Sequence, residues 1–321
     1  MENTSELTRI LYLSRLDNSM QPALVCPASG SEKRPLAVCL HTWSCGIDHT
    51  YEQFLERCRE RNWHFIFPLF RGPNHQPEAC GSDLVVSDLE CAVSYMQQTY
   101  PVDEDKIYLI GGSGGGHASL LMAGRCPELF TAISSWCPIS DIAAWFAQSR
   151  KIKGESDRRY YDDHIFEACG GNPVEDPEAA AQAKHRSPIT WLANAKGRVI
   201  LDIGTGIHDG HRGSVPISQA ILAFNEVAEP KDRIAPEDIA FMVENERVPE
   251  HLRFCGEDPA YGPHKVLLRR TSGMVRFTLF EGGHDLLPGT GFGFLENQTR
   301  GAAPIWYSGD SYDVKAFELT K

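Results

Sequence analysis

The stretch that decides the fold is Lys106-Ile107-Tyr108-Leu109-Ile110-Gly111-Gly112-Ser113-Gly114-Gly115, in which an apolar strand runs directly into a glycine-rich turn. A helical segment from Gly115 to about Arg125 follows at once. The turn matches the pattern Gly-x-Ser-x-Gly, and its place between a strand and a helix is that of a nucleophile elbow. Glycine neighbours permit the sharp backbone turn that such a serine needs. We therefore expect Ser113 to present its hydroxyl at the carboxyl edge of a sheet, above a helix N-terminus.

A glycine-rich turn between a strand and a helix can instead bind a phosphate group. A dinucleotide fingerprint that starts at Gly112 fails, because its sixth position is His117. The Lys-Ser/Thr pair of a phosphate loop is also missing. The sequence therefore favours the elbow.

The rest of the chain alternates apolar strands with helical periods, which predicts an α/β fold with a mostly parallel central sheet covered by helices on both faces. We expect a single domain over residues 1–321, with an N-terminal β-hairpin at about 7–26 and lid-like polar insertions at about 148–190 and 229–270. The expected core strands are Leu36 to Leu40, His64 to Phe70, Lys106 to Ile110, Thr131 to Trp136, Arg198 to Ile203 and Val275 to Phe280.

A catalytic serine needs a base and an acid, and in this architecture they follow it in the order serine, acid, histidine. His284 comes just after the last expected strand, behind Gly282 and Gly283, and is the expected base. His251 and His264 are weaker candidates, because they lie in a polar insertion.

The acid is expected after the strand that ends at Ile203. We favour Asp209, in Gly206-Ile207-His208-Asp209-Gly210, and keep Asp202 as the second candidate, although it lies within the strand. His208, Asp209 and His211 together also suggest a metal cluster, but no further protein ligand accompanies them at a clear spacing. We expect no metal and no cofactor.

The oxyanion hole should combine the backbone N–H of Gly114 with one from the loop after the strand Leu36 to Leu40. That second donor is Thr42 or Trp43, and the sequence does not distinguish between them.

The composition is that of an ordinary globular protein: 321 residues, 42% hydrophobic and 23% charged, with a net charge of −12. This acidity argues against nucleic acid or an anionic membrane as a partner, and no apolar run approaches the roughly 20 residues of a membrane helix. The first ten residues lack a signal-peptide pattern, so we expect a cytoplasmic protein unless a signal has been removed. The ten cysteines contain no Cys-x-x-Cys pair, and we expect them to be reduced.

From about residue 36 to 146, and again from 198 to 286, the chain resembles the prolyl oligopeptidase-like branch of the α/β-hydrolases, including its short propeller-less esterases. The segments that carry the resemblance, besides the elbow, are His41-Thr42-Trp43 where that family has His-Gly-Gly, Phe70-Arg71-Gly72, Asp88, Val102 to Ile107, and Pro138-Ile139-Ser140-Asp141. Two departures are that Thr42 and Trp43 replace glycines, and that the acid loop from Gly204 to Val215 is long.

The resemblance implies a serine hydrolase that cleaves a carboxylic ester, such as an acetyl ester of a carbohydrate or another small alcohol. The expected substrate contacts are His41, Arg71, Trp136 and His208. About 35 residues precede the first core strand, too few for the propeller of the family's large peptidases, which weighs against a peptidase. The alternatives are a serine peptidase of the prolyl oligopeptidase type and a non-catalytic protein with a hydrolase fold.

Overall fold

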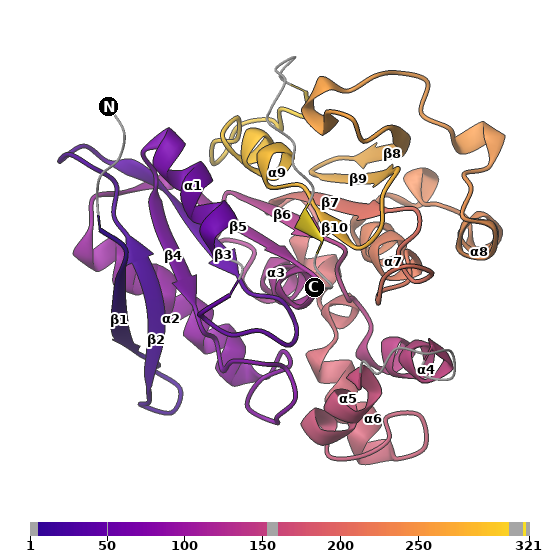
Figure 1. The fold of residues 1–321 in the computed structure, drawn as a ribbon, viewed down its shortest axis with the longest axis horizontal. Helices are drawn as coiled ribbons and strands as arrows, with labels where there is room; N and C mark the ends of the chain where they lie inside the picture. The colour runs from indigo at the N-terminus through magenta and orange to yellow at the C-terminus, as the bar shows by residue number, and fades with distance from the viewer. Residues whose placement is uncertain (1–5, 50, 153–159, 308–316, 319–321) are drawn as a thin grey trace.

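A nine-stranded sheet forms the centre of the computed structural model, which describes residues 6–49, 51–152, 160–307 and 317–318. The strand order is β1-β2-β4-β3-β5-β6-β7-β9-β8, and the strands from β4 to β9 in that order are parallel to their neighbours. β1, β2 and β8 are antiparallel additions at the two sides (Figure 1). The expected mostly parallel sheet is therefore confirmed.

The strands are β1 (Thr8–Leu13), β2 (Met20–Cys26), β3 (Arg34–Leu40), β4 (His64–Pro68), β5 (Val102–Gly112), β6 (Ala132–Trp136), β7 (Ile200–Gly206), β8 (Val266–Ser272), β9 (Val275–Phe280), β10 (Asp285–Leu286) and β11 (Phe317–Glu318). The helices are α1 (Glu52–Arg61), α2 (Asp83–Thr99), α3 (Gly114–Arg125), α4 (Ile142–Ile152), α5 (Tyr161–Cys169), α6 (Pro177–Arg186), α7 (Ser218–Val227), α8 (Pro236–Asn245) and α9 (Pro288–Leu295).

Alternate residues of the central strands enter two separate cores, one on each face of the sheet. In β5, Ile107 and Leu109 pack into the core beneath α2, α3 and α7, whereas Tyr108 and Ile110 pack into the core beneath α1 and α9. This period of two is what a strand buried on both faces produces. The sheet is thus held rigidly between helices, with the ends of its parallel strands along one edge (Figure 1).

The two expected insertions contain more regular structure than their polar sequences suggest. The first holds α5, α6 and the end of α4, while its residues 153–159 lie outside the described residues. α4, α5 and α6 bury a separate apolar cluster that includes Trp145 and Ile165 and also takes in Trp43. The second insertion holds α8 and also β8, which pairs with β9 as an antiparallel edge strand.

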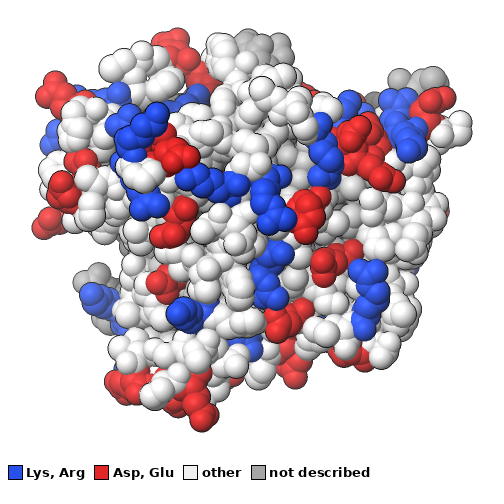
Figure 2. Space-filling model, turned by 180° about the vertical axis from the view of Figure 1, so that it is seen from behind, with Lys and Arg blue, Asp and Glu red and all other residues white. Residues whose placement is uncertain are grey.

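The expected hairpin at the N-terminus is present, since β1 and β2 pair in antiparallel register and join the sheet through β4. No helix within the described parts of the chain is long and apolar enough to cross a membrane. Figure 2 shows acidic and basic side chains interspersed over the face that it displays, without a large patch of one sign. All ten cysteines are free.

Candidate active site

Ser113 occupies a strained turn between β5 and α3. Its backbone has φ 57° and ψ −117°, a conformation that side chains other than glycine rarely adopt. The Ser113 N–H donates to the Trp136 carbonyl at 2.9 Å, and its carbonyl accepts from the His117 N–H at 2.8 Å. A methyl group on Gly111 would lie 2.5 Å from the Gly115 carbonyl oxygen, so the turn needs glycine there. These features are the ones a nucleophile elbow requires.

The expected base and acid contact each other directly. His284 Nδ1 lies 2.7 Å from Asp209 Oδ2, and both side chains are buried. The other carboxylate oxygen of Asp209 accepts the Val215 N–H at 3.1 Å, which fixes the orientation of the carboxylate. The acid loop closes tightly over the pair, because a methyl group on Gly213 would lie 2.6 Å from His284 Cβ. The geometry suits an acid that holds one tautomer of the imidazole.

The remaining ring nitrogen of the histidine, His284 Nε2, is buried and has no hydrogen-bond partner among the described residues. Ser113, Asp209 and His284 follow β5, β7 and β9, and their strands lie in the order β5-β6-β7-β9, so all three residues come from the same edge of the sheet. The free Nε2 is the atom that accepts a serine proton in such a triad. Catalysis by these three residues remains a prediction.

The start of α3 and the loop after β3 approach each other closely enough for an oxyanion hole. A methyl group on Gly114 would lie 2.4 Å from both the backbone N and the Cα of Trp43, and 2.9 Å from the Thr42 carbonyl carbon. The first N–H groups of a helix have no partner within it. The sequence left Thr42 and Trp43 open as the second donor. The backbone nitrogen of Trp43 lies close to Gly114, which favours Trp43.

The loop that carries Trp43 is held by polar and aromatic contacts. The Trp43 carbonyl accepts from the Asn74 backbone N–H at 2.9 Å and from its side-chain amide at 3.2 Å. The Trp43 ring lies edge-on to His117 and Trp145, with centroids 5.8 and 4.7 Å away. Its indole nitrogen is buried without a hydrogen-bond partner in the described part of the chain. The loop is therefore rigidly packed at the point where it meets α3.

His41 packs against this loop, and its expected contact with substrate stays a prediction. The imidazole is fully buried and stacks on Phe70, with 3.9 Å between ring centroids. Its two nitrogens lie 2.9 Å from the Thr42 carbonyl and 2.7 Å from the Leu69 carbonyl. Burial lowers the pKa of His41, and the hydrogen bonds to the two carbonyls offset part of that effect. His41 thus orders the backbone beside Gly114.

The side chain of Trp136, another expected substrate contact, also lies elsewhere. The indole N–H donates to the Ser134 hydroxyl, and the ring packs in the core against Tyr261 and Phe280. The ring therefore serves the packing of the core in this structure. Trp136 acts on the site through its carbonyl, which accepts the N–H of Ser113.

Arg71 is a third expected substrate contact, and its guanidinium is bound by protein groups. Its guanidinium binds the buried carboxylate of Asp88 through two hydrogen bonds of 2.7 and 2.9 Å. The remaining donors reach Asp17 and the Ser14 hydroxyl, next to the β1–β2 hairpin. All of these partners are protein groups, so the guanidinium ties the hairpin to α2.

His208 is the fourth expected substrate contact, and it lies between two glutamates. Its Nδ1 lies 2.5 Å from a carboxylate oxygen of Glu246, and its Nε2 lies 2.7 Å from one of Glu281. Partial burial lowers the pKa of His208, but the hydrogen bonds to Glu246 and Glu281 outweigh it, so that the pKa is raised. His211 contacts the Val243 carbonyl and Glu246. The suggested cluster of His208, Asp209 and His211 is therefore not assembled.

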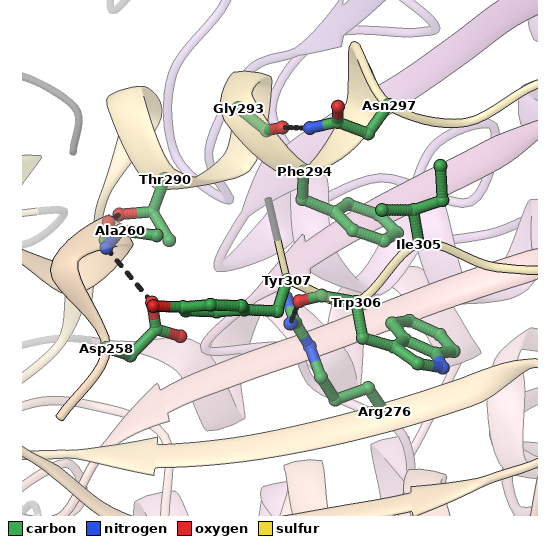
Figure 3. Close-up of a pocket in the computed structure, with 10 residues that line it drawn as sticks. All are labelled: Asp258, Ala260, Arg276, Thr290, Gly293, Phe294, Asn297, Ile305, Trp306 and Tyr307. Atoms are coloured by element: carbon green, nitrogen blue, oxygen red, sulfur yellow. Dashed lines mark hydrogen bonds between the residues drawn. The ribbon is translucent and has the colours of Figure 1, made fainter. Parts of the chain in front are cut away.

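Asp202, the second candidate acid, is bound to an arginine within the sheet. Arg276 of β9 donates to both of its carboxylate oxygens, at 2.7 and 2.8 Å. Figure 3 shows Arg276 beside a pocket where it also reaches the Trp306 carbonyl and lies against Phe294. The pocket measures about 20 Å³, which is room for about one water molecule. This setting favours Asp209 as the acid.

Sequence reasoning did not single out Cys137, the residue that follows β6. Its thiol donates to the Asp285 carbonyl at 3.3 Å and accepts from the Thr205 hydroxyl at 3.7 Å. Burial, and then the charge of Asp209, raise the pKa of the thiol. The position was predictable in principle, because β6 lies between the strands that carry the serine and the acid.

The chain is similar to known proteins in one segment of its sequence and in its fold. The model of the prolyl oligopeptidase family matches residues 82–164, which include the elbow. No curated protein matches the chain in sequence. Among solved structures, the acylaminoacyl peptidase of Pyrococcus horikoshii is similar at 17% identity and a TM-score of 0.58, over 88% of this chain and 38% of that one.

Two further solved structures are similar. A prolyl endopeptidase structure has 15% identity and a TM-score of 0.55, over 70% of this chain and 33% of that one. Oligopeptidase B from Leishmania major has 15% identity and a TM-score of 0.51, over 71% and 32%. The chain thus spans about a third of the length of each of these structures. At these identities the likeness shows the fold, and it confirms the expected α/β-hydrolase architecture.

Proposed function

From an α/β-hydrolase fold whose elbow-bearing segment matches the prolyl oligopeptidase family, we propose that this chain is a serine hydrolase that cleaves carboxylic esters. Ser113 attacks the ester carbonyl, and His284 Nε2 takes up the hydroxyl proton. Asp209 holds the imidazole and stabilises its cation. The backbone N–H groups of Gly114 and Trp43 bind the oxyanion. His284 then protonates the leaving alcohol, and water releases the acyl group.

The observation that carries this proposal is the buried His284–Asp209 pair, whose free Nε2 comes from the same sheet edge as the strained serine. An imidazole held by a carboxylate on one nitrogen and unpaired on the other is arranged for general base catalysis. A binding protein without activity has no need to keep a serine in a strained conformation.

The packing beside the oxyanion loop supports a small acyl group, such as acetyl. Trp43 and Trp145 fill the space between that loop and α4, and both rings are fully buried. Rings packed in this way leave little room for a bulky acyl chain next to Gly114. We therefore propose an acetyl ester of a carbohydrate or another small alcohol as the substrate class.

A serine peptidase is the second candidate, and the comparisons favour it, since the similar structures carry peptidase names. The same residues serve both reactions, because a peptide bond differs in its leaving group and not in the attack on its carbonyl.

The test combines active-site labelling with a substrate series. A fluorophosphonate should label the wild-type chain and leave Ser113→Ala unlabelled, whereas no labelling of either would favour a non-catalytic protein. We then compare kcat/KM for chromogenic esters of increasing acyl length and for an N-acyl peptide anilide. The ester proposal expects the acetyl ester to be the best substrate. A higher kcat/KM for the anilide would establish the peptidase instead.

A further inference from the structure

Cys137 lies against the candidate acid–base pair. The Cys137 thiol, one carboxylate oxygen of Asp209 and one ring nitrogen of His284 all lie within 4.8 Å of one another, and the three residues are buried. Within the described residues, no other set of three histidine, cysteine or acidic side chains brings its donor atoms this close. The triad chemistry proposed above uses the acid and the base but has no role for the thiol.

Thiolate, carboxylate and imidazole are the three protein ligands that zinc takes most readily. Donor atoms at about 2.0–2.3 Å from a tetrahedral zinc lie roughly 3.3–3.8 Å apart. The Cys137 thiol thus has to move about 1 Å or less toward the pair. The contact between His284 Nδ1 and Asp209, now 2.7 Å, has to lengthen by a similar amount. Shifts of this size are within the reach of side-chain rotations.

The charges also match a divalent cation. A Cys137 thiolate and the Asp209 carboxylate together carry two negative charges, and a neutral His284 adds none. A divalent cation therefore gives a site of zero net charge, which avoids the large cost of burying an uncompensated ion. Three protein ligands leave the fourth tetrahedral position for water.

We propose that Cys137, Asp209 and His284 form an inhibitory site for Zn²⁺ within the catalytic machinery. Binding of the metal does not depend on the proposed function, but its inhibitory effect does. The order of ligand softness places Zn²⁺ and Cd²⁺ above Mg²⁺ and Ca²⁺ at a site with a thiolate.

The chemistry of zinc binding explains why the metal inhibits hydrolysis. Zn²⁺ forms bonds to the Cys137 sulfur, an Asp209 oxygen and His284 Nδ1, which faces Asp209 in the free protein. The thiol loses its proton to solvent, as a coordinating thiol does. The proton on Nδ1 is also lost and the ring takes one up at Nε2, so that one proton is released overall. A protonated Nε2 does not accept the proton of Ser113, and turnover stops.

The experiment measures metal binding and inhibition separately. Binding is followed with Cd²⁺ in the Ser113→Ala protein, through the ultraviolet charge-transfer band of a cadmium–thiolate bond. One equivalent is expected to bind, and the band is expected to disappear when Cys137→Ser is added. This readout needs no turnover, so it tests the site even if the proposed function fails. A band that persists without the Cys137 thiol, or no band at all, overturns the proposal.

Inhibition is measured by titrating Zn²⁺ against hydrolysis, with a chelator to restore each variant's metal-free rate. In the Cys137 variants, the Zn²⁺ concentration for half-inhibition should rise by at least roughly 10–100-fold. That is the cost of losing a supporting partner of a metal ligand. Cys137→Ser and Cys137→Ala should agree. The matched control is Cys126→Ala, since the Cys126 thiol is also mostly buried and lies 3.5 Å from Glu90. Equal sensitivity of the Cys137 variants and wild type to Zn²⁺ overturns the proposal.

Discussion

A single methyl group added at Gly114 should separate the two halves of the oxyanion hole. The new Cβ of Gly114→Ala would lie 2.4 Å from the backbone N and Cα of Trp43. Ordinary contacts begin near 3.4 Å, so the two segments must move apart by about 1 Å. Trp43 has little freedom to yield, because its carbonyl is bound by Asn74 and its ring packs against Trp145.

A shift of about 1 Å lengthens a hydrogen bond of about 2.9 Å beyond its useful range. Removing one oxyanion donor typically costs about 10²–10³ in kcat. We therefore expect Gly114→Ala to lose about 10²–10³ in kcat on the acetyl ester, with a much smaller change in KM. The assay is steady-state hydrolysis alongside thermal unfolding, so that loss of folded protein is not mistaken for loss of catalysis.

The matched control is Gly124→Ala, at the other end of α3. Its Cβ would lie 2.7 Å from the Trp191 carbonyl carbon, which is also a backbone clash. This variant should lose stability while its folded fraction keeps the wild-type kcat. If Gly114→Ala stayed within about threefold of wild type in kcat, or if Gly124→Ala lost as much, the assigned oxyanion hole would be refuted.

Three further predictions test the remaining parts of the site. Ser113→Ala and His284→Ala should each reduce kcat/KM by about 10³-fold or more, and the double variant should lose little beyond that, because the two act as one unit; additive losses would argue against the pairing. Asp209→Asn should reduce kcat by about 10³–10⁴-fold. Asp202→Asn should instead cost about 3–5 kcal/mol of stability with kcat retained, because it leaves the charge of a buried arginine uncompensated; the reverse outcome would reassign the acid. The pKa of His208 is raised in the folded protein, so its contribution to stability is full below about pH 6.5 and is lost as the pH rises through the raised value. The difference in melting temperature between wild type and His208→Gln should therefore be larger at about pH 6 than at about pH 9, and an equal difference would show that the charge of this imidazole is not what stabilises the loop.

The fold, and the candidate residues that the structure brings together, could be predicted because they depend on local order along the chain. The elbow was predictable because a strand, the Gly111–Gly115 turn and a helix are contiguous. Asp209 and His284 could be proposed from the sequence because parallel strands end at one edge of the sheet. The short loops after β7 and β9 therefore meet there. These arguments need only the positions of strands and loops, and not the directions of side chains.

The features that it did not predict depend on partners far away in the chain. Arg71 and His208 were assigned to substrate, but their charges bind carboxylates of other elements, which no local pattern indicates. β8 was included in a polar insertion, because its arginines resemble those of a loop. An edge strand tolerates such residues, since Arg269 uses its charge on Asp258.

The strained backbone at Ser113 also bears on how the sequence of such a protein evolves. Holding a residue other than glycine at φ 57° typically costs about 1–3 kcal/mol, and glycine at the same position avoids most of that cost. Ser113→Gly should therefore give an inactive protein that melts at a higher temperature than the wild type. A lineage that no longer needed the hydroxyl would gain stability from one codon change, so the proposed catalytic role predicts that the serine is retained at this turn.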